Sequence, residues 1–254
     1  MVTQNDKLKY LIDYLLKESN LKEKIPSDEL SQKKLYRTLT NIRLPKPIKE
    51  EFIKVQDEYL QEELQKKEIK DAQDLLSIKP NIYLWKGDIT TLKCDAIVNA
   101  ANSQMLGCFQ PLHNCIDNAI HSAAGIQVRL DCNEIMKGRK AENGEVIITS
   151  AYNLPSKYIF HTVGPIVYNK VTNQNKEDLK KCYLNCLKIA DELKLTSIAF
   201  CCIATGVFGY PQEDAAHLAY QTVNTYLQEG QSKLKVIFNV FTEVDYEIYK
   251  RILT

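Results

Sequence analysis

The sequence lacks any long apolar run, and it carries almost no net charge. Its 33 Lys and Arg residues nearly balance its 32 Asp and Glu residues, for a formal net charge of +1. No apolar stretch approaches the roughly 20 residues that span a membrane. Acidic residues also interrupt the apolar residues near the N-terminus, unlike a secretory signal. A near-neutral chain offers no electrostatic attraction to nucleic acid or to a membrane surface. We therefore expect a cytoplasmic protein whose partners are neither nucleic acids nor membranes.

Disulfide bonds are not expected, although the chain has eight cysteines. Disulfide frameworks stabilise short secreted domains, whereas this chain has 254 residues and no recognisable export signal. Cys108 and Cys115 stand apart, because they flank His113 in a segment with few core residues. Five others lie in apolar, periodic segments, and we interpret them as small buried side chains: Cys94, Cys182, Cys186, Cys201 and Cys202.

Residues 1–78 have the pattern of a small helical extension. Apolar side chains recur at helical spacing in a first segment that ends near Lys17, and Ser27 is the expected N-cap of a second helix. Pro45 and Pro47 break the pattern. A third helix then places four apolar residues on one face: Ile48, Phe52, Val55 and Tyr59. These faces must be covered, and we expect the main domain to cover them.

Residues 79–254 alternate between β-rich and helical segments. We predict strands near residues 82–85, 96–99, 145–149, 158–163, 197–203 and 235–241. We predict helices near residues 115–136, 176–193, 212–228 and 245–253. Several of the strands are nearly continuous apolar runs, as expected where helices cover both faces of a sheet. The pattern therefore predicts an α/β protein, a three-layer α/β/α sandwich whose ligands bind beyond the carboxyl ends of the strands.

Three loops that leave predicted strands contain residues suited to a ligand. Gly206 and Gly209 lie between a buried strand and a helix, where backbone N–H groups suit a phosphate or diphosphate; a tight turn without a ligand is the alternative. Asp88 is placed either to accept a hydrogen bond from an adenine or ribose, or to cap a helix. Because unpaired buried carboxamides are costly, Asn99 and Asn102 either tie loops together or bind a polar ligand.

Cys108, His113 and Cys115 form a Cys-x4-His-x-Cys pattern. Two thiolates and an imidazole this close in sequence favour Zn²⁺ over Mg²⁺ or Ca²⁺. Three protein ligands with an open fourth position are typical of catalytic zinc. A closed structural site needs a fourth ligand, for which His121 is the candidate. The alternative without a metal is two free thiols and a histidine in a surface loop.

Taken together, five segments resemble the macrodomain family. They are residues 87–90 (GDIT), 95–103 (DAIVNAANS), 117–125 (DNAIHSAAG), 161–165 (HTVGP) and 205–211 (TGVFGYP). The resemblance covers about residues 80–254 and implies a sandwich with a mixed sheet and ADP-ribose as ligand. Most macrodomains have a run of glycines where this chain has residues 108–115. This departure resembles the zinc-containing macrodomain subclass, whose members also carry an N-terminal helical extension.

The resemblance implies a role for each matching residue. Asp88 would bind the adenine amino group beside the Ile89 amide, and Asn102 would hydrogen-bond the distal ribose. Asp117 matches an aspartate near the scissile bond, so Asn102 and Asp117 are the expected catalytic residues. The diphosphate would be wrapped by one loop: Thr205, Gly206, Val207, Phe208 and Gly209.

The resemblance also implies roles for two aromatic residues. Phe208 would pack near the distal ribose. Phe241, at the end of the last predicted strand, is a looser match to an aromatic residue that stacks on the adenine, and a place in the core is the alternative.

The implied activity is zinc-dependent hydrolysis of the N- or O-glycosidic bond between C1″ of the distal ribose and a protein side chain. Either Zn²⁺ or Asp117 can orient or activate the attacking water. In members of the subclass, a sirtuin-type transferase adds mono-ADP-ribose to a lipoyl-carrier protein, and the macrodomain removes it. The resemblance therefore implies that such a carrier is the partner. The alternatives are an ADP-ribose reader with a structural zinc, and an RNA-binding macrodomain, which the near-neutral charge disfavours. The helical extension either recognises the carrier or stabilises the fold, and we favour the second.

Overall fold

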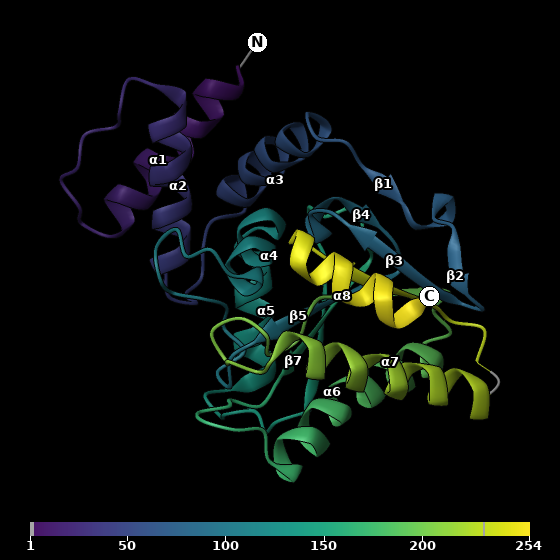
Figure 1. The fold of residues 1–254 in the computed structure, drawn as a ribbon. Coiled ribbons are helices and arrows are strands. Elements are labelled where there is room, and N and C mark those ends of the chain that lie inside the picture. The colour runs from purple at the N-terminus through teal and green to yellow at the C-terminus, as the bar shows by residue number, and fades with distance from the viewer. Residues whose placement is uncertain (1–2, 231) are drawn as a thin grey trace.

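The computed structural model describes residues 3–230 and 232–254 (Figure 1). A seven-stranded sheet has the order β2-β3-β9-β8-β5-β7-β6. The strands from β3 to β7 in this order run parallel, and both edge strands, β2 and β6, are antiparallel. The sheet is therefore mixed, as expected. Its strands are β2 (Ser77–Lys79), β3 (Ile82–Lys86), β5 (Ala96–Ala101), β6 (Val146–Ser150), β7 (Tyr158–Val163), β8 (Ser197–Phe200) and β9 (Lys235–Val240).

Helices cover both faces of this sheet, because alternate residues of each strand point to opposite sides. On one face, Tyr183 of α6 packs against Phe200 of β8 with ring centroids 4.9 Å apart. On the other face, Asp117 of α4 accepts a hydrogen bond from Asn99 of β5. The predicted three-layer sandwich is confirmed (Figure 1). Its helices are α4 (Ile116–Ala124), α5 (Gln127–Met136), α6 (Asn173–Glu192), α7 (Gln212–Glu229) and α8 (Glu243–Leu253).

The N-terminal extension consists of α1 (Gln4–Glu18), α2 (Glu29–Ile42) and α3 (Glu50–Gln65). The N-cap of α2 is Asp28 and not Ser27, because the Asp28 carboxylate accepts a hydrogen bond from the Ser31 N–H. The three helices share a small core of their own, to which Ile126 of the α/β part also belongs. They lie beside α4 and α5 and not on the sheet (Figure 1).

The segment predicted as one helix over residues 115–136 is two helices. Gly125 ends α4 in a backbone conformation with φ of +103°. The side chain of Gln56 from α3 enters at this break, where its Oε1 accepts a hydrogen bond from the Ile126 N–H at 3.1 Å. The prediction of one helix was wrong because a glycine alone does not reveal that a distant side chain accepts the hydrogen bond of the Ile126 N–H.

Two short strands begin before residue 79. β2 pairs with β3, and β1 (Lys70–Asp71) pairs with β4 (Leu92–Lys93) in a separate two-stranded ladder. β1 and β2 therefore pair with strands of the α/β part, and the seven-stranded sheet begins two residues ahead of residue 79, where the sequence suggested the boundary.

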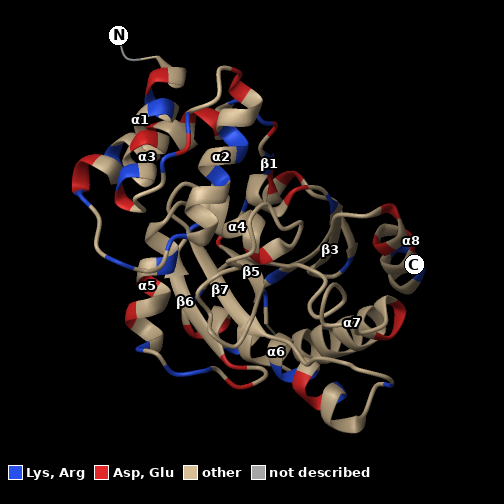
Figure 2. Cartoon of the chain, turned by 90° about the vertical axis from the view of Figure 1, so that its left-hand side faces the viewer, with Lys and Arg blue, Asp and Glu red and all other residues tan. Residues whose placement is uncertain are grey.

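Charged residues lie mainly on helices and loops. Figure 2 shows Lys and Arg interspersed with Asp and Glu along the helices of the extension, whereas β5 and β7 carry neither. Among the described residues, no helix combines the length and the apolar character needed to cross a membrane.

Candidate active site

The expected ligand-binding residues gather at one edge of the sheet. The carboxyl ends of parallel strands meet there, so the loops that follow them are neighbours. Asp88 follows β3, Phe241 follows the adjacent β9, and Asn102 follows β5. Residues 205–209 follow β8, which lies between β9 and β5. The structure therefore brings together residues that are more than 150 positions apart in the sequence.

At the β3 end, Asp88 is held by Thr90, whose hydroxyl donates to Asp88 Oδ1 at 2.6 Å, and by Lys67. Asp88 Oδ1 also accepts a hydrogen bond from the Thr90 N–H at 3.0 Å, which caps a short 3-10 helix, η2 (Ile89–Thr91). Its Oδ2 lies 3.2 Å from Nζ of Lys67, which follows α3. Burial alone would raise the pKa of Asp88, but the hydrogen bonds from Thr90 and the charge of Lys67 lower it. Asp88 is thus kept ionised as a hydrogen-bond acceptor, and its capping role is confirmed.

Phe241 lies at the end of β9 with 72% of its surface exposed. The alternative that placed it in the core is therefore wrong. Asn239 of the same strand donates a hydrogen bond to the Gly87 carbonyl at 3.0 Å, which ties the β9 end to the Asp88 loop. An exposed aromatic ring at a strand end next to the loop that carries a carboxylate suits recognition of a flat heterocycle with amino groups.

The loop after β8 forms a closed turn. The Gly209 N–H donates to the Gly206 carbonyl at 3.0 Å, and the Phe208 carbonyl accepts from the Val167 N–H at 2.8 Å. Gly209 has a φ of +71°, and a Cβ there would lie 3.0 Å from the Val167 carbonyl oxygen. Within the described chain, the N–H groups of Gly206, Val207 and Phe208 have no hydrogen-bond acceptor. Three free amides at an exposed tip are suited to an anion.

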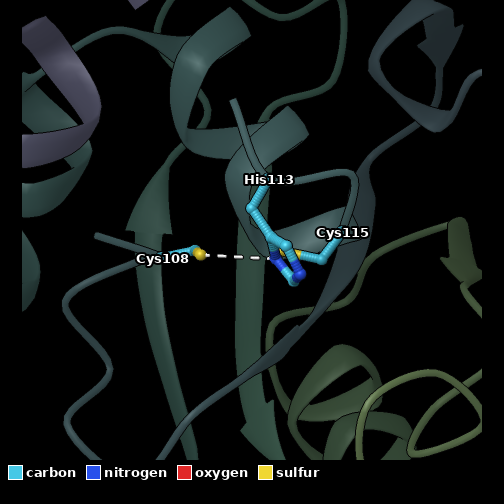
Figure 3. Close-up of side chains that lie close together, drawn as sticks. All are labelled: Cys108, His113 and Cys115. Atoms are coloured by element: carbon cyan, nitrogen blue, oxygen red, sulfur yellow. Dashed lines mark hydrogen bonds between the residues drawn. The ribbon is translucent and has the colours of Figure 1, made fainter. Parts of the chain in front are cut away.

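The three expected metal ligands converge (Figure 3). They belong to residues 106–115, called here the metal loop. The ligand atoms of Cys108, His113 and Cys115 all lie within 4.8 Å of one another, with Cys108 Sγ 3.6 Å from His113 Nδ1. Two sulfurs and one imidazole nitrogen fit Zn²⁺. Burial raises the pKa of the Cys115 thiol to about 11, so a metal bound there displaces its proton.

No fourth Cys, His, Asp or Glu of the described residues joins this group. His121 lies elsewhere, in a buried group with Cys132 and His161. Neither nitrogen of its imidazole has a hydrogen-bond partner in the described chain. Burial also holds the pKa of His121 well below its ordinary value, so the ring stays neutral.

Asp117 lies in the first turn of α4, two residues after Cys115, and is only 5% exposed. Its Oδ1 accepts a hydrogen bond from Asn99 Nδ2 at 2.8 Å and lies 3.5 Å from Nε2 of His121. Burial raises the pKa of Asp117 to about 6. The described chain gives Oδ2 no hydrogen-bond donor, so this oxygen is the one available to a water or a ribose hydroxyl.

Asn99 and His161 form a buried polar layer beneath Asp117. They occupy paired positions of β5 and β7, with Asn99 Nδ2 3.1 Å from His161 Nδ1. Nε2 of His161 lies 3.0 Å from the Thr149 hydroxyl, and burial lowers the pKa of His161 to about 3. Asn99 therefore forms internal hydrogen bonds, which was one of the two alternatives for the asparagines. A polar residue within each of two apolar strands was the only sequence signal for this layer.

Asn102 shapes the loop that leads from β5 to the metal loop. Its Nδ2 donates to the Gly107 carbonyl at 3.2 Å, and its Oδ1 accepts from the Gln104 N–H at 2.9 Å. The side chain is only partly buried. It therefore keeps a second amide hydrogen for a ligand while it holds the loop.

The chain is similar to known proteins over its whole length. The Macro domain family model matches residues 98–219. A protein-ADP-ribose hydrolase from Staphylococcus aureus (strain MRSA252) is 51% identical over 250 residues, which cover 96% of this chain and 94% of that protein. A protein-ADP-ribose hydrolase from Treponema medium is 45% identical over 261 residues, which cover 100% of both chains.

Two solved structures are also similar. A mutant of the Oceanobacillus iheyensis macrodomain with ADPR has a TM-score of 0.64 and 41% identity, covering 70% of this chain and 95% of that one. The Trypanosoma brucei macrodomain in complex with ADP-ribose has a TM-score of 0.68 and 29% identity, covering 86% and 95%. Together with the strand order and the loops described above, these similarities lead to one conclusion: the chain belongs to the macrodomain family.

Proposed function

We propose that this protein is a protein-ADP-ribose hydrolase that releases mono-ADP-ribose from a modified protein, with Zn²⁺ held by Cys108, His113 and Cys115. The observation that supports the zinc proposal is the convergence of these three side chains, the last of which lies two residues before Asp117. Relatives named protein-ADP-ribose hydrolase share 45% to 51% identity across nearly the whole chain. The enzyme class, a hydrolase acting on ADP-ribosyl-protein, follows from that similarity.

The binding mode follows the sheet edge from β3 to β5. Asp88 and the Ile89 amide would take the adenine, with Phe241 stacked on its face. The free amides of Gly206 to Phe208 and the N-terminus of α7 would take the diphosphate. Asn102 would take the distal ribose, which places C1″ near Asp117 and the metal loop.

Asp117 would hold the attacking water or a ribose hydroxyl through Oδ2, because Oδ1 is already fixed by Asn99. A carboxylate fixed in this way contributes typically 10² to 10⁴ in rate when it acts as an acid or base. Zn²⁺, when bound, supplies Lewis-acid polarisation of a nearby oxygen. The bond that breaks is the one between C1″ and the protein side chain.

The proposal includes a substrate and a location in the cell. The resemblance to zinc-containing macrodomains supports a lipoyl-carrier protein, modified by a sirtuin-type transferase, as the partner. We also propose a cytoplasmic setting for the reaction, as expected from the sequence.

Release of free ADP-ribose from a mono-ADP-ribosylated protein tests the proposal. Purified protein is assayed as isolated, after removal of metal with a chelator, and after re-addition of Zn²⁺. We expect release to fall sharply on metal removal and to return with Zn²⁺. Cys108→Ser should lose both the metal and this activity yet bind ADP-ribose within about twofold of the parent. Cys186→Ala, which removes a buried thiol in α6, is the matched control and should keep both.

Two results would contradict parts of the proposal. Full release by metal-free protein would exclude zinc dependence. Binding of ADP-ribose without release, across substrates modified on acidic residues and on arginine, would indicate a reader with a structural zinc.

A further inference from the structure

The N-terminal extension contacts the metal loop through α2. Arg37 of α2 donates from Nε and Nη2 to Asn118 Oδ1 at 3.0 Å and 2.7 Å, and Nη2 also donates to the His113 carbonyl at 3.2 Å. His113 is itself one of the three expected metal ligands. A guanidinium fork therefore binds the backbone of a metal ligand and the first turn of α4 at the same time.

Asn41, one turn further along α2, makes the second set of contacts. Its Oδ1 accepts hydrogen bonds from the Leu112 N–H at 3.1 Å and from Asn118 Nδ2 at 3.0 Å. Asn118 Nδ2 also donates to the Gln110 carbonyl at 3.0 Å. Asn41 is 2% exposed and Asn118 is fully buried. Removing a partner would leave a buried polar atom unsatisfied, which is costly.

The first half of the metal loop is tied to the end of α2 by Arg129 of α5. Its Nε donates to the Leu106 carbonyl at 2.7 Å, and its guanidinium lies over the Phe109 ring, 4.3 Å from the centroid. Its Nη1 donates to three carbonyls at the carboxyl end of α2, those of Thr40, Asn41 and Arg43. Both flanks of Cys108, and the backbone between Cys108 and Cys115, are thus held by α2 or by a residue bonded to it.

We propose that Arg37 and Asn41 are positioning residues of the metal site, and that the extension holds the metal loop in the conformation in which Cys108, His113 and Cys115 converge. This inference rests on the proposed function, because it assigns the loop to Zn²⁺. It goes further by giving the extension a specific task. Groups that orient metal ligands from outside typically change metal affinity 10- to 100-fold when removed.

Zinc affinity in the full-length chain tests this inference, measured by competition with a chromogenic chelator. In Arg37→Ala and Asn41→Ala, we expect the affinity for Zn²⁺ to fall at least about tenfold. Arg37→Lys should recover only part of it, because an ammonium group cannot reproduce the fork. The matched control is Lys33→Ala on the same helix, since Lys33 pairs with Glu29 and Glu63 inside the extension. Its zinc affinity should stay within about twofold of the parent.

Amide hydrogen exchange at Leu112 gives a readout that does not depend on metal. We expect the Leu112 N–H to exchange faster in Arg37→Ala and Asn41→Ala than in Lys33→Ala, while ADP-ribose affinity stays within about twofold of the parent in all three. Parent-like zinc affinity together with parent-like exchange at Leu112 would overturn the inference.

The two proposals can fail separately. If the parent chain binds no Zn²⁺, the proposed zinc dependence fails, and Leu112 exchange alone decides whether α2 orders the loop. Faster exchange in the two variants would then support the ordering role, and equal exchange would exclude it.

Discussion

Phe241 is a residue whose exposure and position predict a measurable effect. Its ring is 72% exposed at the carboxyl end of β9, beside the loop of Asp88. Stacking of a base on an aromatic side chain is worth about 1 to 3 kcal/mol, so Phe241→Ala should weaken ADP-ribose binding about tenfold. Because the ring is exposed, we expect the free energy of unfolding to change by no more than about 0.5 kcal/mol.

Calorimetric titration with ADP-ribose and urea denaturation measure these two quantities. Val244→Ala removes another exposed apolar side chain, 59% exposed and located on α8. It should change neither quantity. Unaltered ADP-ribose affinity in Phe241→Ala would assign adenine recognition to other residues.

Residues with a motif were predictable from the sequence, and residues that act through packing were not. Asp88, Asn102 and the three metal ligands follow strands or occupy a recognisable spacing, and the fold brings them to one edge. Arg37 contacts Asn118 across 81 positions and has no motif of its own. Nothing local in its sequence distinguishes it from Lys33 or Lys34 in the same helix, because its role depends on which element packs against α2.

The break between α4 and α5 supports a prediction about an element. An alanine Cβ at Gly125 would lie 2.7 Å from both Gln56 Nε2 and Gln127 Oε1, and the backbone φ is +103°. Gly138 also has a positive φ, +78°, but a Cβ there meets no atom within 4 Å. Gly138→Ala should therefore cost about 1 to 2 kcal/mol of strain alone, and Gly125→Ala should cost clearly more.

Urea denaturation of the two glycine variants provides the measurement. Equal destabilisation would mean that Gln56 and Gln127 move aside without cost. The extension would then pack less tightly against the α4–α5 break than the distances indicate.

The extension should also lose stability in acid through Glu63 of α3. Burial alone would raise the pKa of Glu63, but hydrogen bonds from Lys33, Lys66 and Gln4 outweigh it and lower the pKa to about 2, from an ordinary value of 4.5. A carboxyl whose pKa is lower in the folded state stabilises that state above pH 4.5. This stabilisation is lost as the pH falls from 4.5 towards 2.

Glu63→Gln should accordingly be less stable than the parent at pH 7, with a smaller difference at pH 3. Urea denaturation, monitored by far-UV circular dichroism, measures the free energy of unfolding at both pH values. Glu50→Gln, at an exposed position in the first turn of the same helix, is the control and should show no such dependence. A constant difference between the two pH values would mean that Glu63 acts through packing and not through its charge.

Helices and strands with a clear period of apolar residues were predicted well. Very short strands, and a helix interrupted by a glycine, were not. β7 has the bounds that the sequence predicts, and β3 and β9 differ by one residue. β1 and β2 are two and three residues long, which is too short for an alternating pattern to show. The strand predicted over residues 197–203 stops at Phe200, because Cys201 onwards turns into the loop that closes on Val167.

The balance of charge over the whole molecule predicts that RNA is not a ligand. A formal net charge of +1, with acidic and basic residues interspersed along the helices in Figure 2, gives little net attraction for a phosphate backbone. We expect no binding of a mixed-sequence single-stranded RNA at micromolar concentration in 50 mM or 200 mM salt, measured by fluorescence anisotropy. Tight binding that weakens steeply with salt would identify a basic surface that the charge distribution does not show.

The bonds that Arg129 makes to the end of α2 have a consequence for synthesis. The extension leaves the ribosome before the α/β part and has most of a core of its own, so its helices can pack early. The last carbonyls of α2 have no Arg129 to bond until translation has added 86 more residues. At 5 to 20 residues per second this takes roughly 4 to 17 s. During that interval the carbonyls at the end of α2 can bond only to water.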